Sequence, residues 1–225
     1  MQRILDVIFS FSALVLLFPF LLPVIIILRF TGEGDVFYVQ KRVGRGGHEF
    51  GLLKFATMLK DSPNIGSGEI TISNDPRVLP LGKFLRKTKL NELPQIWNIL
   101  VGHMSIVGPR PMVPNTFANY PEPAQQKLNT VRPGLTGIGS IVFRDEERFL
   151  IDRENPTQFY NNHIIPYKSD IEIWYVKNQS LCLYSKIIFI TAWVVIFPNL
   201  KLGNKFFANL PQMPEELLSS CSARS

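Results

Sequence analysis

Cysteines, histidines and, in one region, carboxylates are scarce in this sequence. The 225 residues include two cysteines and three histidines, and the cysteines, Cys182 and Cys221, lie far apart. Their spacing matches neither a disulfide framework nor a Cys/His metal site, which fits a reducing compartment. Residues 77–120 contain a single carboxylate, Glu92. The cations of the same stretch are Arg77, Lys83, Arg86, Lys87, Lys89 and Arg110.

The overall charge is positive. A net charge of +6 and a pI near 9.4 imply an anionic partner, which is nucleic acid, an anionic membrane face or a phosphate-bearing substrate. A recognisable nucleic-acid-binding motif is lacking, so we expect no nucleic acid as partner. The length suits one domain with appendages and is sufficient for a real hydrophobic core.

The surplus of cations around Glu92 predicts phosphate chemistry. A lone acid among cations stays ionised, and the same cations can hold phosphate groups. Phosphoryl transfer relies mainly on positioning and charge neutralisation, so it is the chemistry that this stretch favours. A structural alternative remains open, in which Asn91 is the N-cap of an apolar helix and Glu92 only favours the helix dipole.

The sequence Gly108-Pro-Arg-Pro111 is a stronger indication. Two prolines fix the backbone on both sides of Arg110. The guanidinium is therefore presented with little conformational freedom left to lose, which suits bidentate phosphate binding.

Ordered motifs along nearly the whole chain resemble the bacterial sugar transferases of the monotopic phosphoglycosyl transferase superfamily. The central match is Leu90-Asn-Glu-Leu-Pro-Gln95, followed by Met104-Ser-Ile-Val-Gly-Pro-Arg-Pro111. The other matching segments are Arg3 with Asp6, Gln40-Lys-Arg-Val-Gly44, Lys54-Phe-Ala-Thr-Met58, Asp75-Pro-Arg77, Arg132-Pro-Gly-Leu-Thr-Gly137 and Tyr175-Val-Lys-Asn178.

The resemblance implies transfer of a sugar 1-phosphate from a UDP-sugar to undecaprenyl phosphate with Mg²⁺ as cofactor, an early membrane step of polysaccharide or glycoconjugate assembly. It implies Glu92 and Asn91 as the catalytic and metal-binding residues. The phosphate ligands that it implies are Lys54, Arg86, Arg110 and Arg132. A homo-oligomer is left open.

Three positions depart from the family pattern. The family has a nucleophilic aspartate where this chain has Asn91, an arginine in place of Ala56 and an aspartate in place of His103. An amide cannot form the family's covalent phosphosugar intermediate, so Glu92 is left as the nearby carboxylate to attack or to bind Mg²⁺. The alternative function is a catalytically lapsed, membrane-bound relative that binds lipid phosphate or partner glycosyltransferases.

Residues 7–28 form an uncharged, apolar segment that we expect to lie in lipid. The segment is too long for a secretory signal peptide, and its length suits a straight transmembrane helix. Pro19 and Pro23 predict a sharp bend instead, and Pro19 matches the proline at which the family's re-entrant helix turns back. In either case the cations between Arg29 and Arg45 place the next domain on the cytoplasmic face of the bacterial inner membrane.

The expected fold is α+β and mainly helical, with a membrane helix in residues 1–30, a transferase domain in 31–180, and an interfacial helix with a loose tail in 181–225. Residues 36–40 and 48–55 are expected to form a β-hairpin, and 61–74 a mobile loop. Residues 160–178 read as a helix of the core. Residues 187–197 suit either an interfacial helix or a buried one.

Overall fold

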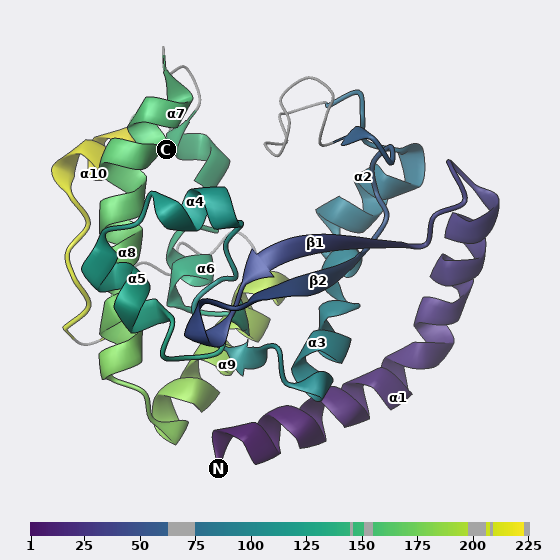
Figure 1. Cartoon of the computed structure of the whole chain (residues 1–225), viewed down its shortest axis with the longest axis horizontal. Coiled ribbons are helices and arrows are strands. Elements are labelled where there is room, and N and C mark those ends of the chain that lie inside the picture. Colours follow the sequence, from purple (N-terminus) through teal and green to yellow (C-terminus); the bar gives the residue numbers. More distant parts are fainter. Residues whose placement is uncertain (63–74, 145, 151–154, 198–205, 208, 223–225) are drawn as a thin grey trace. The chain divides into compact units, whose positions relative to one another are not determined.

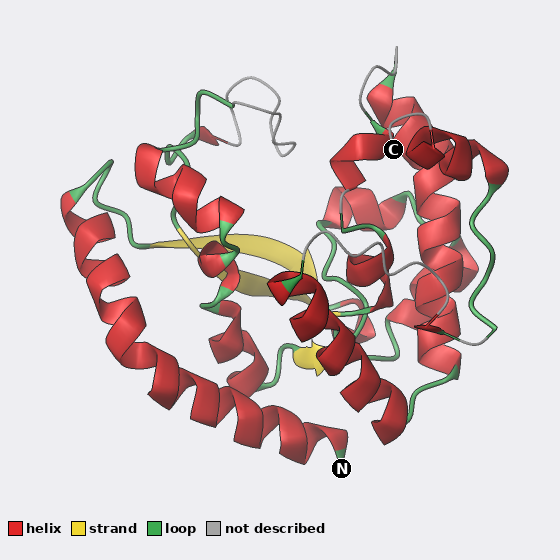
Figure 2. Cartoon of the chain, turned by 180° about the vertical axis from the view of Figure 1, so that it is seen from behind, coloured by secondary structure: helices red, strands yellow, loops and turns green. Residues whose placement is uncertain are grey.

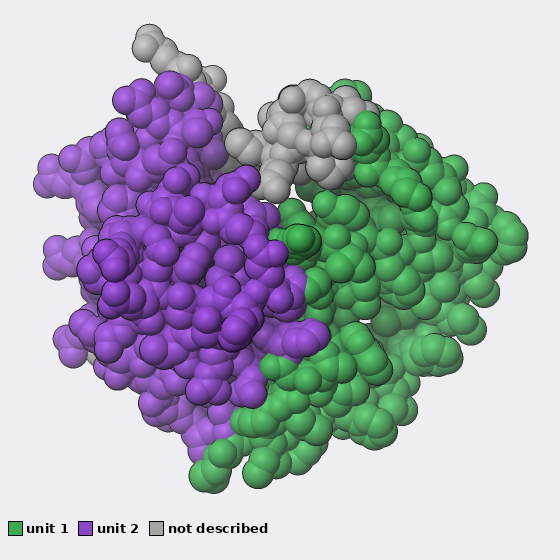
Figure 3. Space-filling model, viewed as in Figure 1, with its two compact units in different colours: residues 1, 3–41, 51–102 green, residues 2, 42–50, 103–225 purple. Residues whose placement is uncertain are grey.

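The computed structural model describes residues 1–62, 75–144, 146–150, 155–197, 206–207 and 209–222. Most of the loop predicted at 61–74 lies outside the described residues. The chain forms two compact units, shown in Figure 3. Unit 1 comprises Met1, Arg3–Lys41 and Gly51–Gly102, and unit 2 comprises Gln2, Arg42–Phe50 and His103–Ser225. The secondary structure is mainly helical with two small sheets, so the predicted α+β class is confirmed.

In unit 1, helix α1 (Gln2–Phe30) is one continuous helix that contains both Pro19 and Pro23. Figures 1 and 2 show that this ribbon changes direction along its length, as expected when prolines remove backbone hydrogen bonds and clash with the preceding turn. Among the described helices, α1 is the one that is long and apolar enough to cross a membrane. Most of its large apolar side chains are exposed, which is typical of a segment that lies in lipid.

Both ends of α1 pack against the rest of unit 1. At the start, Arg3 donates hydrogen bonds to the carbonyl oxygens of Ile99 and Leu100, at 2.5 and 2.8 Å. Near the end, Leu28 is buried in a hydrophobic cluster with Phe55 and Leu85. The two ends of the apolar helix therefore contact the same compact unit.

Unit 1 also contains three short helical segments and the greater part of a β-hairpin, whose residues 42–50 belong to unit 2. Strands β1 (Phe37–Val43) and β2 (Glu49–Phe55) pair around the turn η1 (Arg45–Gly47), which confirms the predicted hairpin. Helix α2 (Pro80–Lys87), the 3₁₀ turn η3 (Leu90–Glu92) and helix α3 (Gln95–Val101) follow. Pro80 at the first position of α2 and Gly102 with φ of +98° after α3 are residues that suit these helix ends.

Unit 2 is built around two short parallel strands, β3 (Ser105–Val107) and β4 (Gly134–Thr136), in which Ser105 faces Gly134. Its helical elements are α4 (Pro114–Ala118), α5 (Glu122–Leu128), α6 (Ile138–Val142), η4 (Glu146–Phe149), α7 (Pro156–Phe159), η5 (Tyr160–Ile164), α8 (Ile165–Lys177), α9 (Leu181–Ile196) and α10 (Glu215–Ser222). Helix α8 confirms a helix within the predicted residues 160–178, and Ile165, Ile171 and Tyr175 are buried. Of the positions that we expected in the core, Ile173, Trp174 and Val176 are half-buried and Asp170 is exposed.

Helix α9 is buried on one face and exposed on the other. Tyr184, Ile187 and Ile190 are buried, whereas Phe189 and Trp193 are exposed on the apolar opposite face. The sequence left two interpretations of this segment, a buried core helix and an interfacial helix. The buried face fits the first, and the exposed apolar face is compatible with the second. The predicted loose tail instead contains α10, whose Leu217 is fully buried.

Candidate active site

Asn91 and Glu92 lie in the 3₁₀ turn η3, between α2 and α3 of unit 1. Lys89 before them has a φ of +60°, a left-handed conformation that is uncommon outside glycine and that turns the chain sharply after α2. Helix α3 begins only at Gln95, and its N-cap is Pro94. The interpretation of Asn91 as an N-cap of that helix is therefore wrong.

The Asn91 side chain is buried, and its Oδ1 has no hydrogen-bond partner in the part of the chain that the structure describes. A buried carbonyl oxygen without a donor is costly, so such atoms call for a partner that binds with the substrate or a cation. Glu92 lies next to it in the turn and is half-buried. The turn thus carries an amide and a carboxylate on consecutive residues.

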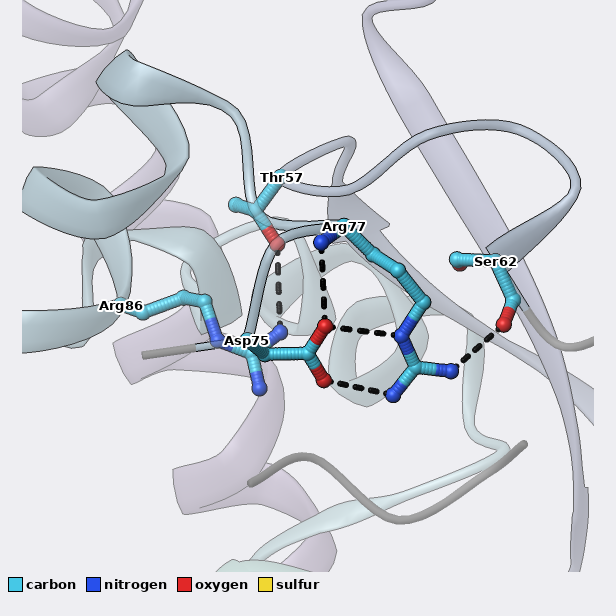
Figure 4. A network of polar contacts seen from close by, with 5 residues as sticks. All are labelled: Thr57, Ser62, Asp75, Arg77 and Arg86. Atoms are coloured by element: carbon cyan, nitrogen blue, oxygen red, sulfur yellow. Dashed lines mark hydrogen bonds and ion pairs between the residues drawn. The ribbon is translucent and has the colours of Figure 1, made fainter. Parts of the chain in front are cut away.

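Arg86 is in the last turn of α2, and one of its terminal nitrogens lies 3.4 Å from Thr57 Oγ1 (Figure 4). A hydrogen bond of that length is weak. The same view shows that the buried Arg77 guanidinium donates two hydrogen bonds to the Asp75 carboxylate, at 2.8 and 2.6 Å, and a third to Ser62 O. Arg77 is therefore a structural cation, and the phosphate-holding role that the charge count suggests for it is not supported.

Lys54 lies on β2, and Asn98 of α3 holds that strand in place. Asn98 Oδ1 accepts from Leu53 N at 2.9 Å, and Asn98 Nδ2 donates to Gly51 O at 2.8 Å. The buried amide thus satisfies a donor and an acceptor on the strand edge. It fixes β2 at Gly51 and Leu53, on either side of Leu52 and directly before Lys54.

We expect Asn98→Ala to lower the free energy of unfolding by about 1–3 kcal/mol, because two partly buried hydrogen bonds that hold β2 are lost with the buried amide. Chemical denaturation followed by tryptophan fluorescence measures this change. Asn178→Ala is the matched control, since Asn178 is exposed and its side-chain amide donates to Trp174 O of the preceding helix α8. Equal effects of the two substitutions would contradict the role given to Asn98.

In unit 2, Arg110 lies on the loop after β3. Pro109 and Pro111 are buried, whereas Arg110 between them is exposed. Backbone bonds join this loop to the β4 region, from Gly108 N to Thr136 O at 2.9 Å and from Gly134 N to Pro109 O at 2.8 Å. The arginine therefore projects from a rigid base, as its proline neighbours predict.

Arg132 is on the segment that packs directly against this loop. A Cβ at position 108 would lie 2.5 Å from Arg132 O, so only glycine allows the two backbones to come so close. Pro109, Arg110, Asn129 and Pro133 line a small pocket beside the contact. The structure thus brings Arg110 and the Arg132 segment together within unit 2, while Lys54, Arg86, Asn91 and Glu92 are all in unit 1.

Sequence reasoning missed a buried charged cluster behind the Arg110 loop. Lys168 of α8 forms an ion pair with Glu146 at 2.7 Å, and its ammonium lies over the rings of Phe143 and Tyr160. Burial alone lowers the pKa of Lys168, but Glu146 and Tyr160 outweigh it and raise the pKa. Lys168 and Glu172 lie one turn apart on an otherwise apolar face of α8. This four-residue spacing of opposite charges is the sequence pattern from which the buried cluster could have been predicted.

The described residues contain no group of three or more His, Cys, Asp or Glu side chains arranged to hold a metal. At η3, Asn91 and Glu92 offer one amide oxygen and one carboxylate, so a metal held there would need further oxygen ligands. That pattern is typical of Mg²⁺, which keeps several waters and takes further oxygens from substrate phosphates.

Comparison with known proteins identifies relatives over most of the chain. The family model described as bacterial sugar transferase matches residues 1–198. The exopolysaccharide production protein ExoY of Rhizobium meliloti is 34% identical over 81% of this chain and 85% of its own length. The undecaprenyl-phosphate galactose phosphotransferase of Salmonella typhimurium is 31% identical over 87% of this chain and 40% of its own length.

A third relative is the UDP-glucose:undecaprenyl-phosphate glucose-1-phosphate transferase of Xanthomonas campestris, 33% identical over 83% of this chain. The chain spans 40% of the Salmonella protein and 37% of the Xanthomonas protein, so it matches one part of each.

Proposed function

This chain belongs to the bacterial sugar transferase family, and from that membership we propose that it transfers a sugar 1-phosphate from a UDP-sugar to undecaprenyl phosphate. The names of the Salmonella and Xanthomonas relatives support this substrate pair. The structural observation that carries the proposal is the exposed Arg110 on a proline-anchored loop, in a chain that also has an exposed apolar helix. One feature suits a phosphate, and the other suits a lipid-borne acceptor.

The reaction forms a bond between the sugar-bearing phosphorus and an oxygen of the lipid phosphate, and it breaks the bond from that phosphorus to UMP. Two routes use Glu92 differently. In a direct route the lipid phosphate oxygen attacks, and Glu92 only orients the reactants or binds a cation. In a covalent route the Glu92 carboxylate attacks first and UMP leaves, and the lipid phosphate then attacks the acyl phosphate and restores the carboxylate.

Magnesium is part of the proposal. The unpartnered Asn91 Oδ1 and the Glu92 carboxylate would hold the ion, with substrate phosphates and waters as the remaining ligands. A bound Mg²⁺ would neutralise the charge of the diphosphate. The chain's own cations, Arg86 on α2 and Arg110 on its loop, would bind and orient the phosphate oxygens.

We further propose that α1 is re-entrant and that the catalytic part lies on the cytoplasmic face of the inner membrane. The contacts of Arg3 and Leu28 support this, because both ends of α1 pack against the same compact unit. A straight spanning helix would place its ends on opposite sides of a hydrocarbon core about 30 Å thick. The cations in the last turn of α1 and after it, such as Arg29 and Lys41, favour the cytoplasmic side.

The test is UMP release by detergent-solubilised protein given undecaprenyl phosphate, Mg²⁺ and a panel of UDP-sugars, with chelator and no-lipid controls. We expect release with at least one sugar and a dependence on both lipid and Mg²⁺. Asn91→Asp runs alongside. Silence of the native chain together with turnover by the aspartate variant would favour the catalytically lapsed relative instead.

A further inference from the structure

Glu172 is a carboxylate in the interior of unit 2. It lies on α8, and 2% of its surface is exposed. Lys168, one turn earlier, forms its ion pair with Glu146. An ionisable group at such a depth costs stability unless hydrogen bonds satisfy it, so its partners indicate what it does.

Those partners are backbone N–H groups. The Glu172 carboxylate accepts hydrogen bonds from the amides of Arg110 and Gly139. Pro109 and Pro111 have no N–H, so the Arg110 amide is the only backbone donor in that tripeptide. A Cβ at position 139 would lie 2.3 Å from Glu172 Oε1, so the glycine lets the carboxylate reach its place.

Helix α8 also contacts the last residue of β3, directly before this loop. Tyr175, one turn after Glu172, donates from its hydroxyl to Val107 O at 3.1 Å. The loop is also bonded to the β4 region through Gly108 N and Pro109 O. All of these other bonds have backbone carbonyl acceptors, which do not titrate, whereas the acceptor of the Arg110 amide can take up a proton.

The second oxygen of Glu172, Oε2, is buried and lacks a hydrogen-bond partner within the described ranges. Burial raises the pKa of Glu172 to about 7, against the opposing effects of Lys168 and the two N–H groups. The titratable groups around it are Lys168 on α8, Arg110, Tyr120 before α5, and Tyr160 on η5. Helix α6 supplies none.

Between pH 6 and 8, Glu172 is the member of this cluster whose charge we expect to change. The pKa of Lys168 is raised, so its ammonium stays charged. Burial raises the pKa of Tyr120 and of Tyr160, so both stay neutral. Glu146, on η4, forms the 2.7 Å ion pair with Lys168.

We propose that Glu172 is a positioning residue for Arg110: the ionised carboxylate fixes the Arg110 backbone and so the direction of the guanidinium, and proton uptake by Glu172 loosens that segment. The consequence for catalysis rests on the proposed function, because it assumes that Arg110 binds the phosphates of the donor. Weaker binding of a UDP-sugar at pH 6 than at pH 8 then follows.

Local order and global stability move in opposite directions. Lowering the pH from 8 to 6 adds a proton to native Glu172 but not to the unfolded chain, where its pKa is near 4.5, so the folded state gains stability. Over the same interval the Arg110 amide loses a charge-assisted bond. If Glu172 had only a structural role, global stability and the local order at the Arg110 amide would both fall, or neither would change.

The native protein allows a first test, by NMR measurement of amide hydrogen exchange in detergent at pH 6 and pH 8, corrected for intrinsic rates. The protection of the Arg110 and Gly139 amides should fall about fivefold at pH 6 relative to pH 8. The Gly108 and Gly134 amides, bonded to backbone carbonyls, are internal references and should not change. If the protection of the Arg110 and Gly139 amides changed no more than that of the Gly108 and Gly134 amides, the proposal would be overturned.

Glu172→Gln is the second test, because glutamine keeps the size and one acceptor oxygen but does not titrate. The native KM for the UDP-sugar should rise about fivefold from pH 8 to pH 6, whereas the variant should show a flat profile. The lipid phosphate itself titrates near pH 6, and comparing the two proteins removes that effect. Ser169→Ala is the control, since buried Ser169 bonds only Ile165 O of its own helix, and it should keep the native profile.

The readouts separate this inference from the proposed function. If the native protein releases no UMP at any pH, the function fails, and amide exchange still decides the role of Glu172. If it releases UMP with a KM that does not change between pH 6 and 8, the function stands and the inference fails. A Glu172→Gln protein that does not fold leaves the native exchange data to decide.

Discussion

Glu92→Gln is expected to lower UMP release by about 10²- to 10⁴-fold, the range found when a positioned catalytic acid or base is removed. The substitution keeps the size of the side chain and removes its charge. Glu92 is the one carboxylate of residues 77–120, and it follows buried Asn91 directly in the η3 turn. A residue that only favoured a helix dipole would have a far smaller effect.

Glu122→Gln is the matched control, since Glu122 is exposed on α5 and bonds Gln126 of the same helix. It should leave turnover within about twofold of native, the modest effect expected at an exposed surface site. Turnover by Glu92→Gln at the level of this control would refute a catalytic role for Glu92. Thermal unfolding of both variants shows whether a loss of activity reflects a loss of folded protein.

Isotope exchange separates the two routes open to Glu92. Labelled UMP is incubated with the unlabelled UDP-sugar without undecaprenyl phosphate. A covalent intermediate returns label to the UDP-sugar, whereas direct attack by the lipid does not. Asn91→Asp should increase the exchange if the family's covalent route has been lost with the aspartate, and the increase should disappear in the Asn91→Asp, Glu92→Gln double variant if both carboxylates are needed.

Arg110→Ala is expected to lower kcat/KM for the UDP-sugar by about 10- to 200-fold, which corresponds to about 1.5–3 kcal/mol for hydrogen bonds to a charged group. Arg110→Lys should recover only part of this loss, because an ammonium keeps the charge but not the planar fork that binds two phosphate oxygens. Arg110 is exposed, so neither variant should lower the thermal unfolding midpoint measurably.

Lys127→Ala controls for a general loss of positive charge, since Lys127 is exposed on α5. If Arg110→Ala and Lys127→Ala reduce kcat/KM equally, Arg110 acts only through the net charge of the protein. A salt titration adds a second criterion. A bidentate contact at a rigid loop should lose less strength with added salt than long-range attraction does.

The sequence alone determined the features that depend on neighbouring residues. Two prolines around Arg110 were enough to predict a restricted backbone on both sides of the arginine, because they limit the local backbone whatever surrounds it. The hairpin follows in the same way from β-formers on both sides of a glycine-rich turn, and the mainly helical class from the length and spacing of the apolar segments. The order of the family motifs identified the family.

The tertiary structure decided which charged groups are available, because that depends on burial and on contacts between distant segments. Asp75 and Arg77 are neighbours in sequence, but only burial shows that they neutralise each other. Asn91 reads as a helix cap until the fold places the cap at Pro94. The hydrogen bond from the Arg110 amide to Glu172 joins two segments that are far apart in the sequence. The helical spacing of apolar residues predicts which face of α8 is buried, but it does not predict which segment packs against that face.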